Sequence, residues 1–572
     1  MNLNPEQKAI GTRNFQAAIG SEFTRRDFLM GSIAAGVASG AGLGAFYYGY
    51  DKSIGDPVRV GIIGTGDEGG VLIGAISPDY VQVKAIADIR PYNVHRAFHG
   101  DMSALHVRPG LIAKYEYSDE DKARENIKVY DQDYKDLLND DDIEGVIIAL
   151  PLHLHDKVAI EAMLAGKHVL TEKLMAHSVH QCKNMGRVAR REKKILATGH
   201  QRHYSILYDN AVAMIKKGLL GDLHHIRAQW HRGNLPGSDS WRPPLPTDDD
   251  LGKYLAGRRK SLKETEERLP TLSGSAKASQ LKRMEDLSVQ IQKAELQMLD
   301  RDVDAAKYGY EQKILKSGET TYECSPLEEL IRWRLWDRTG GGLMAELGSH
   351  QLDAAGIFCS ALREDGKKAQ PLSVTGVGGR HIFPLDRECD DHVYCMFEFP
   401  GPGYDATTAP EKKIVVTYSS INGNGFGGYG ETVLGTEGTL ILEREQNAML
   451  FKGSSTMTKV SVEAKGGGAA LSTTDSGEMS VAVGQDATKE ISRGYTEEME
   501  HWAWCLRNFQ PEGDYAEQPQ PKCKPEVALA DAVIALTSNI ALAEGRKIDF
   551  DPAWFDIDSD ATPEGVAPSE PV

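Results

Sequence analysis

Hydrophobic runs rich in β-branched residues alternate with amphipathic stretches in the part of the chain that follows residue 55. The stretch 156–165 has the periodicity of a helix, and it lies between two such runs. Strands that alternate with helices predict βαβ units and a parallel sheet, whose ligands bind at the carboxyl ends of the strands. We therefore expect an α/β domain with a parallel sheet over residues 56–199. The runs that we read as its strands are 58–63, 81–87, 145–150, 167–170 and 195–198.

A second unit is expected over residues 200–550, because shorter strand-like runs recur there between turn signals such as 435–438. Helical patterns close this unit. The loop 454–491 is rich in Gly, Ser and Thr and predicts a mobile excursion. The remaining residues, 551–572, form a tail whose Asp, Pro and Glu content predicts disorder from Asp558 onward. The strand-like runs are 374–378, 392–399, 413–419 and 439–442, and the helical patterns are 493–508 and 526–544.

An insertion interrupts the second unit at about residues 253–315. It is highly charged, and Leu287, Ile291, Ala294 and Met298 recur at helical spacing within it. This pattern predicts an inserted helical hairpin with one apolar face. That face could pack on its own return helix, on the domain body or on another subunit, and the sequence does not choose between them.

The N-terminal segment 1–55 has the pattern of a targeting signal followed by a linker. Arg25 and Arg26 precede an uncharged run, 28–50, that is rich in Gly and Ala and resembles a twin-arginine export signal. We therefore expect a periplasmic or otherwise exported protein. Because small and polar residues dilute the run, contact with a membrane is expected only through an uncleaved signal.

A glycine-rich turn follows the first strand and opens a helix. In Gly64-x-Gly66-x-x-Gly69, the first glycine permits the turn, the second lets the backbone approach a pyrophosphate, and the third lets helix and strand pack closely. Asp88 ends the second strand, where a carboxylate accepts hydrogen bonds from a ribose 2′-hydroxyl. This favours NAD, although Arg90 keeps NADP possible. The expected cofactor contacts at the turn are Gly64, Thr65, Gly66, Asp67, Glu68 and Gly69.

Two further segments carry candidate chemistry. Glu172 and Lys173 follow the short strand at 167–170 and so lie on the expected cofactor side of the sheet, although a lysine at the end of a strand is more often solvated than catalytic. Glu346, His350 and Asp353 recur at i, i+4 and i+7, one face of a helix after a glycine run. A carboxylate one turn from an imidazole orients it and suits it to act as a general base. A solvated helix face with an ordinary ion pair explains the same spacing.

Together these motifs resemble the glucose-fructose oxidoreductase / inositol dehydrogenase / rhizopine-catabolism (Gfo/Idh/MocA) family. The resemblance covers most of residues 56–550 and implies a Rossmann domain, a doubly wound parallel sheet, followed by an α/β domain with an open, largely antiparallel sheet. It implies a homo-oligomer, because that sheet often forms an interface. The chain departs from the family in having Leu174 after Lys173, where the family has Pro, and Glu346 four residues before His350, where the family has Asp.

The same resemblance implies roles for individual residues. His350 is the expected proton acceptor and Lys173 the expected donor to the substrate oxygen. Glu346 is a third catalytic candidate, which would either orient His350 or bind a substrate hydroxyl. Arg202 and Asp353 are expected to contact substrate. Pro151, His155, Glu172 and Lys173 complete the expected cofactor contacts.

Charge and cysteine content narrow the function classes. The 83 acidic and 65 basic residues leave a net charge of −18, which argues against nucleic acid as a partner. The 7 cysteines include no C-x-x-C pair, and His224, His225 and His231 have no carboxylate or cysteine at ligand spacing, so no metal site is expected.

We expect an exported NAD(P)-dependent oxidoreductase acting on a sugar, polyol or glycoside. The alternative is a glycoside hydrolase or lyase that oxidises a sugar hydroxyl transiently, eliminates, and reduces it back. A cofactor-loaded binding protein is the third hypothesis, and the presence of both Lys173 and His350 argues against it.

Overall fold

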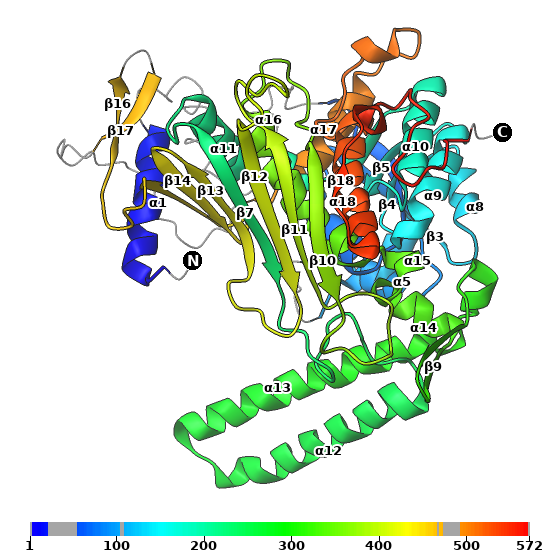
Figure 1. Ribbon diagram of the computed structural model, residues 1–572. Helices are drawn as coiled ribbons and strands as arrows, with labels where there is room; N and C mark the ends of the chain where they lie inside the picture. Colours follow the sequence, from blue (N-terminus) through cyan, green and yellow to red (C-terminus); the bar gives the residue numbers. More distant parts are fainter. Residues whose placement is uncertain (1–2, 21–53, 103–107, 466–467, 473–491, 570–572) are drawn as a thin grey trace.

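The computed structural model describes residues 3–20, 54–102, 108–465, 468–472 and 492–569. Two large sheets stand side by side, each with helices packed on it, and a long helical hairpin projects away from both (Figure 1). The predicted fold class, a Rossmann domain followed by a second α/β domain with an inserted hairpin, is confirmed.

The first sheet has six strands in the order β3-β2-β1-β4-β5-β6, and the neighbouring strands pair in parallel. The strand order reverses between β1 and β4, which is where parallel sheets of this kind bind ligands. Its strands are β1 (Val58–Ile63), β2 (Val81–Ala87), β3 (Lys128–Tyr130), β4 (Gly145–Ile148), β5 (His168–Glu172) and β6 (Leu196–Gly199). Its principal helices are α4 (Asp67–Ala75), α5 (Pro91–His99), α9 (His155–Leu164) and α10 (Val179–Arg191).

The second sheet has eight strands in the order β15-β14-β13-β7-β12-β11-β10-β18, all antiparallel except for the β7–β12 pair. Helices α11 (Ile206–Lys216), α16 (Ser349–Ser360) and α18 (Pro525–Glu544) pack on one face; on the other face helix α1 (Pro5–Gly20) covers the β14–β15 end, and β10 and β11 are open (Figure 1). The strands are β7 (Leu223–His231), β10 (Ser373–Gly379), β11 (His392–Pro400), β12 (Lys413–Ile421), β13 (Tyr429–Gly435), β14 (Gly438–Glu443), β15 (Asn447–Lys452) and β18 (Ile548–Asp549).

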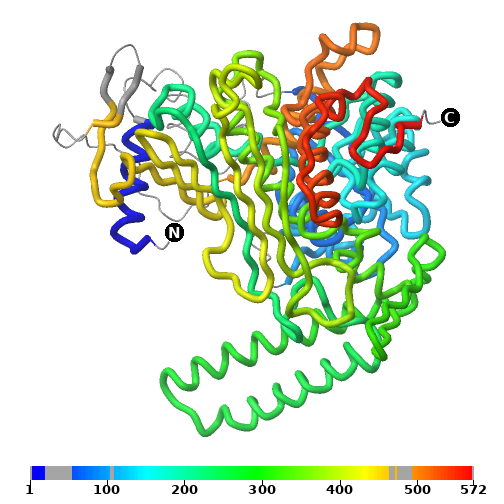
Figure 2. Tube along the Cα trace, in the orientation of Figure 1, coloured from blue at the N-terminus to red at the C-terminus, as the bar shows by residue number. Residues whose placement is uncertain are grey.

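The insertion forms two antiparallel helices, α12 (Lys253–Arg268) and α13 (Gly274–Gln297) (Figures 1 and 2). Leu251, Leu255 and Ala294 form a small core where the two helices join the body, so the apolar face packs mainly on its own return helix. A short helical turn, η5 (Met298–Asp302), then leads the chain back to the first domain. A two-stranded ribbon follows, β8 (Lys313–Ser317) and β9 (Thr320–Cys324), which the sequence pattern did not predict.

Helix α1 (Pro5–Gly20) lies within the segment that we expected to be signal and linker, and it packs against β15. Phe15 and Ala18 are buried in that contact. The side chain of Asn14 donates hydrogen bonds to the carbonyls of Leu450 and Thr458 at 3.1 and 2.9 Å. The expected export signal, with Arg25 and Arg26, lies outside the described residues.

The C-terminal segment returns to the first domain (Figure 2). Helix α17 (Tyr495–Arg507) packs on the first sheet, and Met499 and Trp502 belong to the same hydrophobic core as Val58 and Ile147. A Cβ atom at Gly145 would lie 2.8 Å from the Trp502 ring, so the indole packs directly on the backbone of β4.

Residues 551–569 lie against α10, and the described part of the tail from Asp558 onward is not disordered as expected. Lys183 donates hydrogen bonds to the carbonyls of Ala553, Ser559 and Ala561 at 2.7–3.0 Å, which ties the segment down. Within the described residues α18 is the helix whose length and hydropathy would allow a membrane span, but 67% of its apolar window is buried inside the protein. It is a core helix.

Candidate active site

A cavity of about 1230 Å³ lies between the two domains, at the carboxyl ends of the parallel strands. The first domain contributes the glycine-rich turn and the end of β5. The second domain contributes the start of α16 and its preceding turn, and the foot of the inserted hairpin closes the far end. The residues that line it include Gly66, Asp88, Arg90, Glu172, Lys173, Asp300, Arg334, Glu346 and His350.

The glycine-rich turn has the shape that a dinucleotide requires. Gly64 has a φ of +88°, and a Cβ there would lie 2.3 Å from the carbonyl oxygen of Ala149. A Cβ at Gly69 would lie 2.3 Å from the Gly64 carbonyl oxygen. At Gly66, by contrast, a Cβ would approach only the Asn93 amide, at 3.7 Å, because that side of the residue faces the cavity. The turn thus leaves a space beside the first N–H groups of α4, where a pyrophosphate fits.

Asp88 lies at the end of β2 and borders the cavity. Its carboxylate accepts hydrogen bonds from the Thr65 and Arg90 backbone N–H groups at 2.8 and 2.9 Å, and from the Asn93 amide at 3.1 Å. Burial raises the pKa of Asp88, and these hydrogen bonds oppose the rise. The side chain is therefore fixed at the position from which a ribose diol is held in Rossmann domains.

The Arg90 guanidinium, beside the expected position of the ribose, is held in an ion pair. Its Nε donates a hydrogen bond of 2.8 Å to Asp300, which η5 brings in from the foot of the hairpin. Asp300 also accepts the Tyr92 backbone N–H at 3.0 Å, and its side chain is 1% exposed. Sequence reasoning missed Asp300, because nothing local marks an aspartate that contacts a strand end more than 200 residues earlier.

Arginine side chains border the glycine turn. Arg96 donates a hydrogen bond of 2.9 Å to Asp67, and an Arg334 nitrogen lies 4.0 Å from the same carboxylate. Burial raises the pKa of Asp67, but Arg96 and Arg334 outweigh it and lower the pKa far below its usual range. Asp67 is therefore an anion that holds two cations beside the expected pyrophosphate position.

Lys173 and Glu346 form an ion pair across the domain boundary. The Lys173 ammonium lies 3.2 Å from one Glu346 carboxylate oxygen and donates a 2.8 Å hydrogen bond to the Glu346 carbonyl. Arg334 donates to the other oxygen at 2.5 Å. Burial raises the pKa of Glu346, but the two cations outweigh it and lower the pKa to about 2. Glu346 thus pairs with Lys173 and Arg334, where the sequence pattern led us to expect it to orient His350.

His350 lies on the cavity wall near the Lys173 ammonium. Its ring centroid is 5.4 Å from that of Trp230. Burial lowers the pKa of His350 well below its usual value, and the positive charges of Lys173 and Arg202 lower it further. The imidazole is therefore neutral at physiological pH, which is the form that accepts a proton.

Buried side chains on the interior side fix the loops that precede and follow Lys173. The His155 ring nitrogens lie 2.8 and 2.9 Å from the carbonyl oxygens of Leu174 and Leu150, and the Lys173–Leu174 peptide bond is cis. The buried Glu172 carboxylate accepts the Lys173 backbone N–H at 3.0 Å. Pro151, which follows β4, lines the cavity. His155 thus positions the two loops from the interior, and Pro151 and Glu172 border the cavity.

Arg202 and Asp353 are not brought to the cavity wall. Arg202 is 1% exposed and is paired with Glu445 at 2.7 Å and Glu431 at 3.2 Å. Asp353, also 1% exposed, accepts hydrogen bonds from His203 at 2.8 Å and from Lys368. The geometry therefore does not support the expectation that they contact substrate, because both charged groups are buried and ion-paired inside the protein.

Residues 58–200 match the family model described as an oxidoreductase family with an NAD-binding Rossmann fold. This defines the first domain as a nicotinamide-dinucleotide-binding domain of that class. In the structure comparison, an oxidoreductase domain protein from Kribbella flavida shares the fold, with a TM-score of 0.50 and 13% identity over 87% of this chain and 100% of that one.

Curated relatives are similar over about a third of this chain. A protein of Shewanella pealeana named glycosyl hydrolase family 109 protein is 32% identical over 195 residues, 33% of this chain and 40% of the relative. An alpha-N-acetylgalactosaminidase of Shewanella oneidensis is 29% identical over 174 residues, 30% of this chain and 35% of the relative. The chain thus spans less than half the length of these relatives.

Proposed function

We propose that the whole chain belongs to the Gfo/Idh/MocA family and is an NAD-dependent oxidoreductase acting on a CH–OH group of a sugar, polyol or glycoside. One observation carries the proposal: a single cavity brings the glycine turn together with Lys173, Glu346 and His350. A dinucleotide turn beside a neutral imidazole and a lysine ammonium is an arrangement suited to alcohol oxidation.

Gly66 and the start of α4 would hold the pyrophosphate of the cofactor, and Asp88 the adenosine ribose. When bound, the nicotinamide supplies a hydride acceptor. His350 takes the hydroxyl proton of the substrate, and Lys173 donates a hydrogen bond to the same oxygen as negative charge develops on it. Glu346 and Arg334 hold Lys173 in place.

The Arg90–Asp300 pair supports NAD as the cofactor in preference to NADP. A 2′-phosphate on the adenosine ribose would meet the carboxylates of Asp88 and Asp300, and the one arginine at the end of β2 is already neutralised. NAD carries a hydroxyl at that position, which Asp88 accepts without electrostatic cost.

The names of the two relatives favour a second candidate. One is called a glycosyl hydrolase and the other an alpha-N-acetylgalactosaminidase. In such a reaction a sugar hydroxyl is oxidised transiently and the glycosidic bond is cleaved by elimination. Water then adds to the resulting double bond and the carbonyl is reduced back, with no net change of cofactor. The same His350 and Lys173 would serve the oxidation and its reversal.

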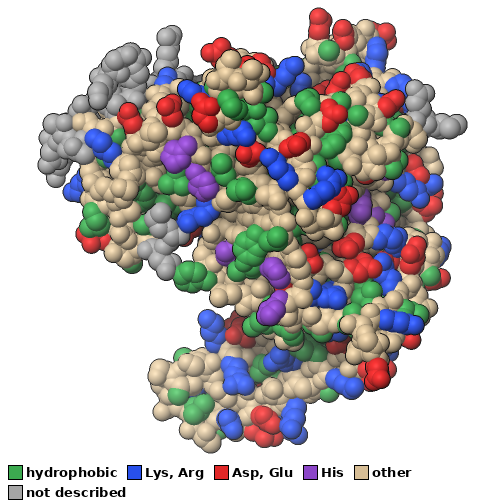
Figure 3. All heavy atoms as spheres, viewed as in Figure 1, with side chains coloured by type: hydrophobic (Ala, Val, Ile, Leu, Met, Phe, Trp, Pro, Cys, Tyr) green, Lys and Arg blue, Asp and Glu red, His purple; other side chains and the backbone are tan. Residues whose placement is uncertain are grey.

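We further propose that the protein is exported by the twin-arginine pathway and is a homo-oligomer that uses the open face of the second sheet. Figure 3 shows exposed hydrophobic side chains on that face, among histidines and charged groups. Val377, Tyr394 and Met396 of β10 and β11 are 68%, 46% and 46% exposed. Large apolar side chains gathered on one exposed surface mark an association site.

The test begins with the cofactor. The purified protein is denatured, and the released small molecules are identified by mass spectrometry, where NAD is expected. The protein is then screened against free sugars, polyols and nitrophenyl glycosides. Reduction of added NAD supports the oxidoreductase, and release of nitrophenol without net NAD reduction supports the glycosidase. If no dinucleotide is retained or bound and neither reaction occurs, the proposal fails.

A further inference from the structure

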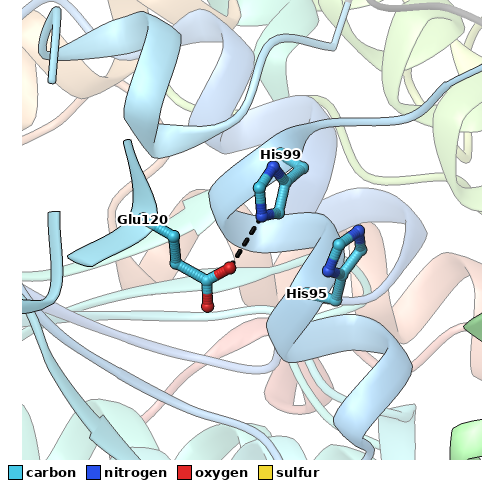
Figure 4. Close-up of side chains that lie close together, drawn as sticks. All are labelled: His95, His99 and Glu120. Carbon is cyan, nitrogen blue, oxygen red and sulfur yellow. Dashed lines mark hydrogen bonds and ion pairs between the residues drawn. The ribbon is translucent and has the colours of Figure 1, made fainter. Parts of the chain in front are cut away.

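Three metal-ligand side chains converge on the outer surface of the first domain, away from the cavity. His95 and His99 lie one turn apart on α5, and Glu120 is the first residue of α7 (Glu120–Arg124). Figure 4 shows the His99 imidazole and the Glu120 carboxylate pointing toward one another, with His95 beside them on the same helix. One donor atom from each lies within 4.8 Å of the other two.

The spacing suits a metal ion. The His99 Nε2 and Glu120 Oε2 atoms are 2.7 Å apart, and the two imidazole rings stack with centroids 4.3 Å apart. Ligand atoms of a tetrahedral zinc ion lie about 3.3 Å from one another, as bonds of about 2.0–2.1 Å require. Small rotations of the three side chains would therefore open the His99–Glu120 contact and place an ion between them.

The surroundings leave the donor atoms available. The side chains of His99 and Glu120 are 39% and 29% exposed, so an ion has direct access from solvent. Arg124 donates a 2.7 Å hydrogen bond to the other Glu120 oxygen, Oε1, and in this way fixes the carboxylate while leaving Oε2 for a ligand. Such an outer hydrogen bond is the kind of support that metal-binding side chains use.

Two other clusters among the described residues lack these properties. His200, Cys523 and Asp531 form one, and His203, Asp353 and Asp531 form the other. All five side chains except that of His203 are fully buried, and Lys368 already pairs with both aspartates. A cation there would compete with an ammonium group inside the protein.

We propose that His95, His99 and Glu120 form a zinc-binding site. Two neutral imidazoles and one carboxylate are the donor set of three-ligand zinc sites, in which water takes the fourth position. The ion would link α5 to α7. Because α5 also carries Asn93 and Arg96, which line the cavity, the link would stabilise the helix at the cofactor side of the domain.

The test is a calorimetric titration of the full-length protein, freed of metal with a chelator and then given zinc chloride. We expect one equivalent to bind to the wild type. His95→Ala and Glu120→Gln should each weaken that binding at least tenfold, because each substitution removes one of the three protein ligands. His224→Ala is the matched control, since His224 is an exposed histidine on the second sheet and outside the cluster, and it should leave the affinity unchanged.

Circular dichroism and the Tm of each metal-free variant show whether it folds. His95→Ala is the decisive variant, because it leaves the His99–Glu120 contact intact. Crystals of the zinc-loaded protein should show anomalous density between the three side chains. Absence of stoichiometric binding in the wild type, or equal affinity in the folded His95→Ala variant, would overturn the proposal. Neither outcome depends on whether the protein binds NAD.

Discussion

Replacing Asp300 by asparagine should shift the cofactor preference toward NADP. The substitution removes a buried charge that is 2.8 Å from the Arg90 guanidinium and keeps the size of the side chain. Two unit charges about 4 Å apart interact by roughly 4 kcal/mol at an effective dielectric constant of about 20. This is the attraction that cancels the Arg90 charge in the wild type.

Only part of that energy becomes available to a 2′-phosphate, because Asp88 remains and the phosphate must be desolvated. We therefore expect NADP binding to strengthen by about 1.4–2.8 kcal/mol, roughly ten- to a hundredfold. NAD binding should change by less than about threefold, since the hydroxyl contact with Asp88 is unaltered.

The assay is a competition. The protein is dialysed against equal concentrations of NAD and NADP, and the retained dinucleotides are released by denaturation and quantified. Asp302→Asn is the matched control, because it makes the same charge change at an exposed position of the same segment. An unchanged ratio in Asp300→Asn, or an equal change in Asp302→Asn, would refute the reasoning. Adding Arg90→Ala to Asp300→Asn should abolish the gain.

Four further predictions concern the catalytic groups, the turn, export and assembly. His350→Ala should lower turnover and remove the acidic limb of the pH–rate profile, whereas Lys173→Met should lower turnover roughly 100- to 1,000-fold and leave that limb in place. Since burial and neighbouring cations depress the pKa of His350, and a base is inactive once protonated, the limb should lie well below pH 6.5. Gly66→Val should abolish cofactor retention with little change in Tm, because its Cβ enters the cavity, whereas Gly69→Val should lower the Tm. Lysines in place of Arg25 and Arg26 should hold the protein in the cytoplasm, which cell fractionation measures, and equal export would contradict the signal. Met396→Glu should shift the protein to a smaller species in analytical ultracentrifugation, and an unchanged mass would exclude the open face as the interface.

The features of the fold and the site that could be predicted are those marked by a pattern of neighbouring residues in the sequence. The glycine turn, Asp88 and Lys173 follow strands whose hydrophobic pattern is clear, so their place at the carboxyl edge follows from topology. The spacing of Glu346 and His350 likewise placed both on the cavity wall.

What could not be predicted depends on partners distant in the chain. Arg202 looked available from its sequence context, but its carboxylate partners lie more than 200 residues later. Arg334 and Asp300 have no local pattern that separates them from other surface charges. Glu346 was assigned to His350 by spacing, and its actual partners come from another domain and another loop.

The contact of α17 with the first sheet has a consequence for the order of folding. Met499, Trp502, Ala503 and Leu506 complete a core whose other buried residues lie between Val58 and Ala197, and Arg507 closes it with an ion pair to Glu144 at 2.7 Å. During synthesis the strands of the first domain leave the ribosome some 300 residues before the helix that covers them. Until α17 has been synthesised, the surface of β4 on which the Trp502 ring packs therefore remains uncovered. A fragment ending at residue 200 would contain the strands and the glycine-rich turn, but it would lack the helix that buries this surface of the sheet.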